Sequence, residues 1–319
     1  MTENDTTNDT TNGTTNGTAE ARAEVVRQQD FTVDGAVELD LATGSGRVEV
    51  TLGDEDGVHV EIRHEPGAGA PWAEGLSSLL SWVTEQFPPV ADAVGGAVPG
   101  DASEAVRQTR IDMTAGRLVV RTPKALPLRN VPLAVSVRAP RGSNVEVRTG
   151  GADITVDGTA GQLDASSGSG AVTVERADGL LSVRTGSGDV RLGEGGDRMR
   201  TRTGSGDIEA SSLDGSATII SGTGDVRLGT VSAAVMARTG SGDVTVTEAV
   251  RDHLELISGS GEIRVGIRSG THAEIDLSSG AGKVRSELDV ADETPDEEAA
   301  LRIRGRSGTG DVVIVSSRG

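Results

Sequence analysis

Residues 185–190 read Thr-Gly-Ser-Gly-Asp-Val, and nearly the same letters return at residues 203–208, 221–226 and 239–244. Neighbouring copies are 18 residues apart, and a looser form, Thr/Ser-Gly-x-x-x-Val/Ile, recurs along most of the chain. Self-similarity at a fixed short period is typical of a solenoid, in which each repeat forms one coil. The copies begin at Thr43, Thr149, Ser167, Thr185, Thr203, Ser221, Thr239, Ser258, Ser279 and Ser307.

Apolar residues alternate with polar ones on both sides of each copy. Five residues after the Thr or Ser, every copy has Val or Ile, as at Val190 and Ile208. Four residues before it, every copy has an apolar residue, such as Leu181. This alternation predicts a strand, a glycine turn and a second strand, and we expect the turn glycines to supply positive φ. The sequence thus predicts an all-β fold, a right-handed single-stranded parallel β-helix of 18-residue coils.

The chain divides into a tail and one long repeat domain. Residues 1–20 are a Thr/Asn/Asp/Gly tail of low complexity that we expect to be disordered. The β-solenoid domain covers residues 21–319, with regular coils over 139–319. The acidic stretch 289–298 is expected to lengthen the penultimate coil into a loop. Residues 311–315 would then lie in an exposed final coil, which could pair end to end with another subunit.

One segment departs from the 18-residue period. Residues 71–90 carry apolar side chains at helical spacing and end on a Pro-Pro pair, which predicts an inserted amphipathic helix. A linker is expected over residues 91–106. The helix could cap the open end of the solenoid, or it could dock to a partner helix or a membrane surface. Its partner-binding candidates are Trp72, Leu76, Leu80, Trp82 and Phe87.

Composition limits both the core and the partners. The chain has no Cys, no Tyr, two Trp and two Phe, so its core must be aliphatic, and disulfides and thiolate metal sites are excluded. The net charge of −19 predicts repulsion from nucleic acids and anionic lipid. There is no long apolar segment and no signal-peptide pattern. We therefore expect a cytoplasmic protein without direct membrane insertion.

A column of carboxylates follows the turns. Asp189, Asp207, Asp225 and Asp243 occupy the same position in successive coils, where stacking would place them about 4.8 Å apart. Such neighbours repel unless something compensates. One interpretation is a divalent-cation face like that of calcium-binding β-rolls, and the other is that each Asp bonds turn backbone while arginines screen it. The candidate arginines are Arg148, Arg184, Arg191, Arg202, Arg227, Arg238, Arg264 and Arg306.

Other chemistry has weaker support in the sequence. A carbohydrate-active β-helix would need aromatic platforms, yet no aromatic residue follows Phe87. The four histidines are scattered and lack a two-histidine metal spacing. We expect no catalytic residues and no cofactor.

The coils at residues 184–190, 202–208 and 238–244 resemble those of the β-strand-repeat "putative adhesin" family of unknown function, also called toastrack domains. The resemblance covers about residues 21–319. It implies a single-stranded β-helix, no established catalytic residues, and association with bacterial envelope-stress or membrane-adjacent systems. We therefore expect a non-catalytic interaction or structural module, a scaffold or sensor for an unidentified and membrane-associated protein partner. A surface adhesin is the alternative, and it would need an export route.

Overall fold

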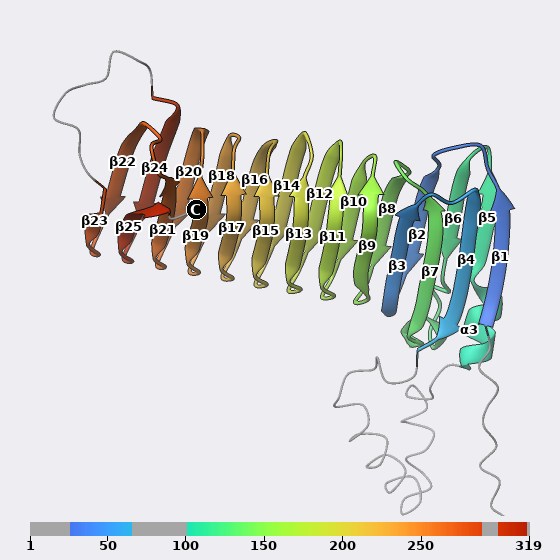
Figure 1. The fold of residues 1–319 in the computed structure, drawn as a ribbon. Coiled ribbons are helices and arrows are strands. Elements are labelled where there is room, and N and C mark those ends of the chain that lie inside the picture. The colour runs from blue at the N-terminus through green and yellow to red at the C-terminus, as the bar shows by residue number, and fades with distance from the viewer. Residues whose placement is uncertain (1–25, 66–100, 289–298, 318–319) are drawn as a thin grey trace, which may run out of the picture.

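The computed structural model of the chain describes residues 26–65, 101–288 and 299–317. These residues form two long sheets that run side by side along one stack (Figure 1). The predicted helix at 71–90, with its five partner-binding candidates, and the tail at 1–20 lie outside the described residues. Within the described part, no helix is long and apolar enough to cross a bilayer.

The two sheets contain 13 and 12 strands and are called sheet A and sheet B. In spatial order, sheet A consists of β1 (Val26–Thr32), β4 (Gly57–His64), β7 (Leu133–Pro140), β3 (Gly46–Gly53), β9 (Asp153–Ala160), β11 (Val172–Ala177), β13 (Val190–Gly195), β15 (Ile208–Leu213), β17 (Val226–Val231), β19 (Val244–Ala249), β21 (Ile263–Arg268), β25 (Val312–Ser317) and β23 (Val284–Ser286). From the same end, sheet B consists of β5 (Arg110–Thr114), β6 (Arg117–Arg121), β2 (Glu38–Thr43), β8 (Asn144–Thr149), β10 (Leu163–Ser167), β12 (Leu180–Thr185), β14 (Arg198–Thr203), β16 (Ser216–Ser221), β18 (Val235–Thr239), β20 (Asp252–Ser258), β24 (Leu301–Ser307) and β22 (Ala273–Ser279).

Parallel pairing dominates both sheets, as a solenoid requires. From β6 and β7 onward each strand pairs in parallel with its neighbours, one coil above and one below. The strands β1, β4 and β5 pair antiparallel and close the N-terminal end. The predicted β-solenoid is confirmed.

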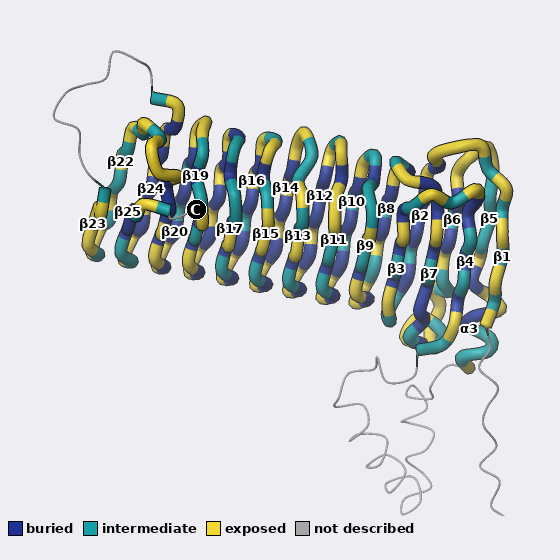
Figure 2. Tube along the Cα trace, viewed as in Figure 1, coloured by how far each residue is buried: buried dark blue, intermediate teal, exposed yellow. Residues whose placement is uncertain are grey.

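The core is the aliphatic column that the repeat predicts. Val190, Ile208 and Val226 are each 0% exposed on sheet A, and Leu181 faces them from sheet B at 0% exposure. One continuous hydrophobic cluster runs between the sheets, and buried residues alternate with more exposed ones along most strands of the stack (Figure 2). Because every coil adds the same few aliphatic side chains, burial accumulates along the stack.

The glycines at the turns are needed for close stacking. A Cβ added to Gly224 would lie 1.9 Å from the carbonyl oxygen of Gly206 in the preceding coil, and one on Gly222 would lie 2.2 Å from Gly204 O. Neither glycine has positive φ. The expectation that the turn glycines supply positive φ is therefore wrong for these corners, although Gly46 in the first corner does have positive φ, at +106°. The turn is a corner that packs on its neighbour so tightly that no side chain fits between them.

The last coil of the chain is not the last coil of the stack. Strands β24 and β25 lie between β20 and β21 on one side and β22 and β23 on the other. Val312 and Ile314 are 0% exposed, whereas Val284 of the outermost coil is 47% exposed. The expected exposed final coil at 311–315 is therefore wrong. The reason lies in composition, because Ser286 of the outer coil pairs with the apolar Ile314.

The N-terminal end repeats this inversion. The first coil, β2 and β3, lies between β6 and β7 on one side and β8 and β9 on the other. The chain therefore begins its first coil in the interior of the stack and adds the outer layer later.

A short helix, α3 (Ala102–Gln108), replaces the end of the expected linker. The Asp101 side chain accepts a hydrogen bond from Ser103 N at 2.9 Å and caps the helix. Ala105 and Val106 are buried. Residues 102–106 were expected to be linker, and that expectation is wrong. Asp101 supplies an N-cap for the helix, and Ala105 and Val106 are buried in the hydrophobic core. A single-turn helix, η2 (Leu128–Asn130), lies in the loop before β7.

The stack order can be tested with engineered disulfides, because the chain has no cysteine of its own. His253 and Arg302 are register partners on adjacent strands, as are Arg302 and Glu274. The pair His253→Cys with Arg302→Cys should oxidise to a disulfide, since adjacent strands lie about 4.8 Å apart and disulfides span about 4.4 to 6.8 Å. His253→Cys with Glu274→Cys should not, because one strand separates the two sites. Non-reducing electrophoresis and peptide mapping read the result, and the opposite pattern would show that the coils stack in chain order.

The close corner predicts a large effect from one methyl group. Gly224→Ala should lower the free energy of unfolding by about 3 kcal/mol or more, because its Cβ meets backbone that cannot give way. Thr223→Ala, at the exposed neighbouring position, should change it by less than about 0.5 kcal/mol. Urea unfolding followed by circular dichroism measures both. Equal stability of the two variants would contradict the packing argument.

Candidate functional site

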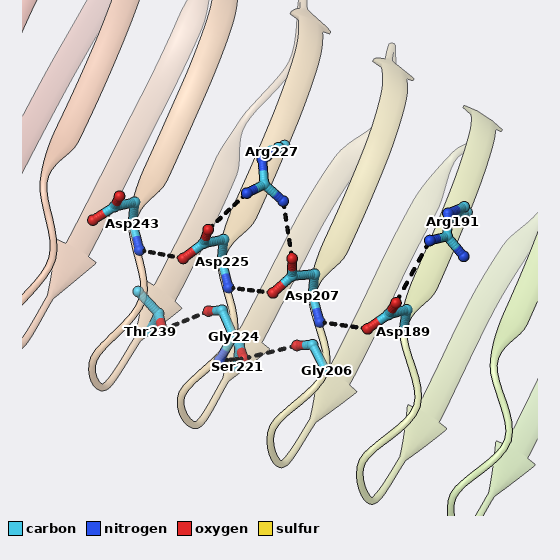
Figure 3. A network of polar contacts seen from close by, with 10 residues as sticks. All are labelled: Asp189, Arg191, Gly206, Asp207, Ser221, Gly224, Asp225, Arg227, Thr239 and Asp243. Carbon is cyan, nitrogen blue, oxygen red and sulfur yellow. Dashed lines mark hydrogen bonds and ion pairs between the residues drawn. The ribbon is translucent and has the colours of Figure 1, made fainter.

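The column of aspartates joins one coil to the next. Asp207 Oδ1 accepts a hydrogen bond from Asp225 N at 2.9 Å, and Asp225 Oδ1 accepts one from Asp243 N at 2.9 Å (Figure 3). Asp189 Oδ1 accepts from Asp207 N at 3.1 Å. Each carboxylate therefore bonds turn backbone, as one interpretation of the sequence predicted, and that backbone belongs to the following coil.

Arginines compensate the charge of this column. Arg227 lies between two carboxylates and donates to Asp207 Oδ2 at 3.0 Å and to Asp225 Oδ2 at 2.7 Å (Figure 3). The backbone N–H of Asp225, and then Arg227, hold the pKa of Asp207 below its usual value. Among the described residues, no three His, Cys, Asp or Glu side chains are placed to hold a metal ion. The four candidate cation ligands are engaged as joints between coils.

The Thr and Ser hydroxyls form a second ladder at the same corner. Thr239 Oγ1 accepts from Gly242 N at 3.1 Å in its own turn and donates to Gly224 O of the preceding coil at 2.9 Å. Ser221 makes the corresponding pair of bonds. These hydroxyls are buried, so they connect coils and face no solvent.

Sheet B carries an arginine patch on its outer face, defined as Arg198, Arg200 and Arg202 of β14 with Arg238 of β18. All four side chains are exposed. Within the described part of the chain, none of the four guanidinium groups forms an ion pair, whereas Arg184 of β12 reaches Asp164 at 3.5 Å. Four unpaired positive charges therefore stand together on a chain of net charge −19.

A shallow groove of about 290 Å³ borders the patch at Arg198 and Arg200. Arg198 and Arg200 line one side of the groove, and Ser216, Thr218 and Met236 lie in the middle. The other side is lined by His253 and Glu255. The groove thus offers two guanidinium groups on one side, two hydroxyls and an apolar thioether in the middle, and the Glu255 carboxylate on the far side. An anion would be held on the side of Arg198 and Arg200.

The sequence misassigned part of this patch. Arg202 and Arg238 were expected to screen the aspartate column, but they precede the corner and so belong to sheet B, while Arg191 and Arg227 follow it and reach the column from sheet A. The pattern Arg-x-Arg-x-Arg on β14 was a signal that sequence reasoning missed, since alternate strand residues share one face.

Asp40 is a buried carboxylate near the N-terminal end of sheet B, which sequence reasoning also missed. Its Oδ2 accepts from Arg117 Nη2 at 2.8 Å and from Arg121 Nη2 at 3.1 Å, both on the neighbouring strand β6. Arg148 of β8 lies 3.9 Å away on the other side. Burial alone would raise the pKa of Asp40, but Arg117 and Arg121 outweigh it and hold this pKa below its usual value. The residue ties the inserted first coil to both neighbours.

Asp40→Asn should lower the free energy of unfolding by about 2 to 3 kcal/mol at neutral pH. The folded-state pKa lies below the unfolded value of about 3.9, so the carboxylate contributes fully above that value and its contribution is lost as pH falls through the folded pKa. The difference between wild type and variant should therefore stay constant down to about pH 5 and shrink below about pH 4. Urea titrations across this range measure it, with Asp164→Asn, an exposed carboxylate, as control. A gap that persists undiminished at the lowest pH would count against the assignment.

Comparison with known proteins places the fold. A family model described as Toastrack DUF4097 matches residues 133–319. No curated protein matches the chain. Among solved structures, it is similar to a "putative adhesin" from Bacteroides fragilis, at 10% identity over 91% of this chain and 97% of that chain with a TM-score of 0.41. It is also similar to a "putative lipid binding protein" from Parabacteroides distasonis, at 9% identity over 92% of this chain and 95% of that chain with a TM-score of 0.37.

The family match covers more than half of the chain and includes nine of the ten repeated corners, from Thr149 to Ser307. With the parallel coils and the glycine corners in place, this protein belongs to the Toastrack DUF4097 family.

Proposed function

We propose that this protein is a non-catalytic scaffold that holds a protein partner on the outer face of sheet B. The observation that carries the proposal is the arginine patch, four exposed and unpaired guanidinium groups within the described part of a strongly acidic chain. The sheet beneath is a rigid platform, because each strand is bonded to a neighbour on both sides.

The polar residues of the corners support a structural role for the repeats. The Thr and Ser hydroxyls are buried and both donate and accept hydrogen bonds, so they are poor candidates for nucleophiles. His59 contacts Asp30 at 2.7 Å on the outer surface of the N-terminal end, away from the corners. A scaffold needs only a stable face, and this is what the stack supplies.

The setting of the scaffold is part of the proposal. We place it in the cytoplasm, at a membrane-adjacent signalling system of the kind that the family resemblance implies. Its partner would then be a protein at or near the membrane.

Site-specific photo-crosslinking in native cells tests the scaffold proposal. A photoreactive residue at Thr218, in the groove on sheet B, should give one dominant protein adduct. The matched control is Thr247, an exposed threonine on β19 of sheet A, which should give none. The same adduct from both positions, or no adduct from either, would contradict a partner-binding face on sheet B. To check the location, intact cells are treated with protease and then fractionated. An adduct that survives the protease and is recovered in the soluble or membrane-associated fraction supports a location inside the cell.

A further inference from the structure

The arginine patch carries a charge arrangement that the fold does not need. Arg184 and Arg202 are register partners on adjacent strands, and Arg198, Arg200 and Arg202 alternate along one strand. Like charges at such positions destabilise a sheet. Asp164 pairs with Arg184, but within the described residues no carboxylate is paired with the three arginines of β14.

A second set of arginines on the same face shows the contrast. Strand β24 has the same alternating pattern, Arg302, Arg304 and Arg306, and there Arg302 pairs with Glu274 at 3.3 Å and Arg304 with Asp276 at 3.2 Å. Two of the three arginines of β24 are therefore neutralised in joints between coils, while Arg306 forms no ion pair within the described residues. On β14 the pattern is left open to solvent.

The spacing of the β14 arginines matches an extended peptide. Alternate residues of a strand lie about 6.6 to 6.8 Å apart, and the same distance separates alternate residues of an extended ligand. A ligand lying along β14 could therefore place one carboxylate over each arginine. Guanidinium groups bind carboxylates through paired, charge-assisted hydrogen bonds, which favours this match.

Neighbouring charges limit how far a ligand can extend across the strands of sheet B. The patch covers strands β14 to β18, which is two steps of about 4.8 Å. Asp164 on β10 and Glu255 on β20 flank it on the two sides. A long polyanion or a flat anionic bilayer would meet these carboxylates, and a bilayer would also meet Glu274 of β22 on the same face. A single extended segment lying along β14 would be two strands from Asp164 and three strands from Glu255.

Apolar side chains at the borders add a second feature. Leu180 is 38% exposed and is the register partner of Arg198, and Met236 is 44% exposed in the groove. A peptide can offer both carboxylates and aliphatic side chains, whereas polyphosphate offers only charge. The borders thus favour a peptide.

We infer that the arginine patch binds a short, extended acidic peptide segment of the partner, with carboxylates at alternate positions over Arg198, Arg200 and Arg202. The inference rests on the proposed scaffold function and names the chemistry of its partner.

Fluorescence anisotropy with the full chain tests it. The probe is a labelled ten-residue peptide of alternating Glu and Thr, and the control peptide has the same composition with its five Glu in one block. The triple variant Arg198→Gln, Arg200→Gln, Arg202→Gln should weaken binding of the alternating peptide by about tenfold or more. The triple variant Arg302→Gln, Arg304→Gln, Arg306→Gln removes the same charge from the same face and should change it by less than about twofold. Binding should weaken as salt is raised.

The thermal stability of the β14 triple variant distinguishes a binding role of these arginines from a structural one. Removing the β14 arginines should leave the midpoint of thermal unfolding unchanged or higher, because they repel one another. A clear loss of stability in the β14 triple variant would mean that these arginines serve the fold, and it would overturn the inference.

Other probes separate the competing occupants. Inorganic polyphosphate and vesicles with phosphatidylglycerol are titrated against the same variants, and sedimentation of the wild type reports self-association. Tighter binding of either anionic probe than of the alternating peptide, or self-association that depends on the β14 arginines, would overturn the acidic-peptide inference. If no peptide binds while the Thr218 adduct persists, the inference fails and the scaffold proposal stands. If the adduct is also absent, both fail.

Discussion

The close contact between glycine corners is the constraint on which the stack depends. Strand pairing brings successive coils to a fixed spacing, and at the corners this leaves about 2 Å between a carbonyl oxygen and the place where a Cβ would stand. Only glycine satisfies that distance. The hydroxyl ladder and the aspartate ladder both run through these corners, so neither could form if the coils were held further apart. The hydrogen bonds between coils and the close packing of the aliphatic core thus both depend on this short distance between successive corners.

The repeat determined most of what could be predicted. The Val and Ile column identified the core because it recurs at a fixed position. Of the arginines expected to screen the aspartates, Arg191 and Arg227 do so. The role of the corner glycines was misjudged because positive φ and close packing select the same residue. The order of the last coils was missed because sequence neighbours were assumed to be spatial neighbours. Seven residues after the corner Thr or Ser, nine of the ten copies have an apolar residue, and the tenth has Ser286. This polar residue marked coil 273–286 as the outer layer.

The candidate site was harder to predict than the fold because its meaning depends on which sheet a residue occupies. Arg202 and Arg227 both lie within a few residues of a corner, yet one faces solvent on sheet B and the other bonds two aspartates on sheet A. Sequence distance from the aspartate does not reveal this difference. The side of the corner does, once the strand boundaries are known. The excess of positive charge on the outer face of sheet B then stands out, because the chain as a whole is negatively charged.

The inverted order of the C-terminal coils has a consequence for synthesis. A ribosome releases residues 273–286 before residues 301–317, so the nascent stack presents β20 and β21 while only the outer coil is available to cover them. The two coils share the same corner register, which allows the earlier one to occupy the place of the later one for a time. The finished arrangement can form only after residues 301–317 have been synthesised. A chain that stops before residue 301 could therefore carry coil 273–286 directly on β20 and β21, one layer inward of its final position.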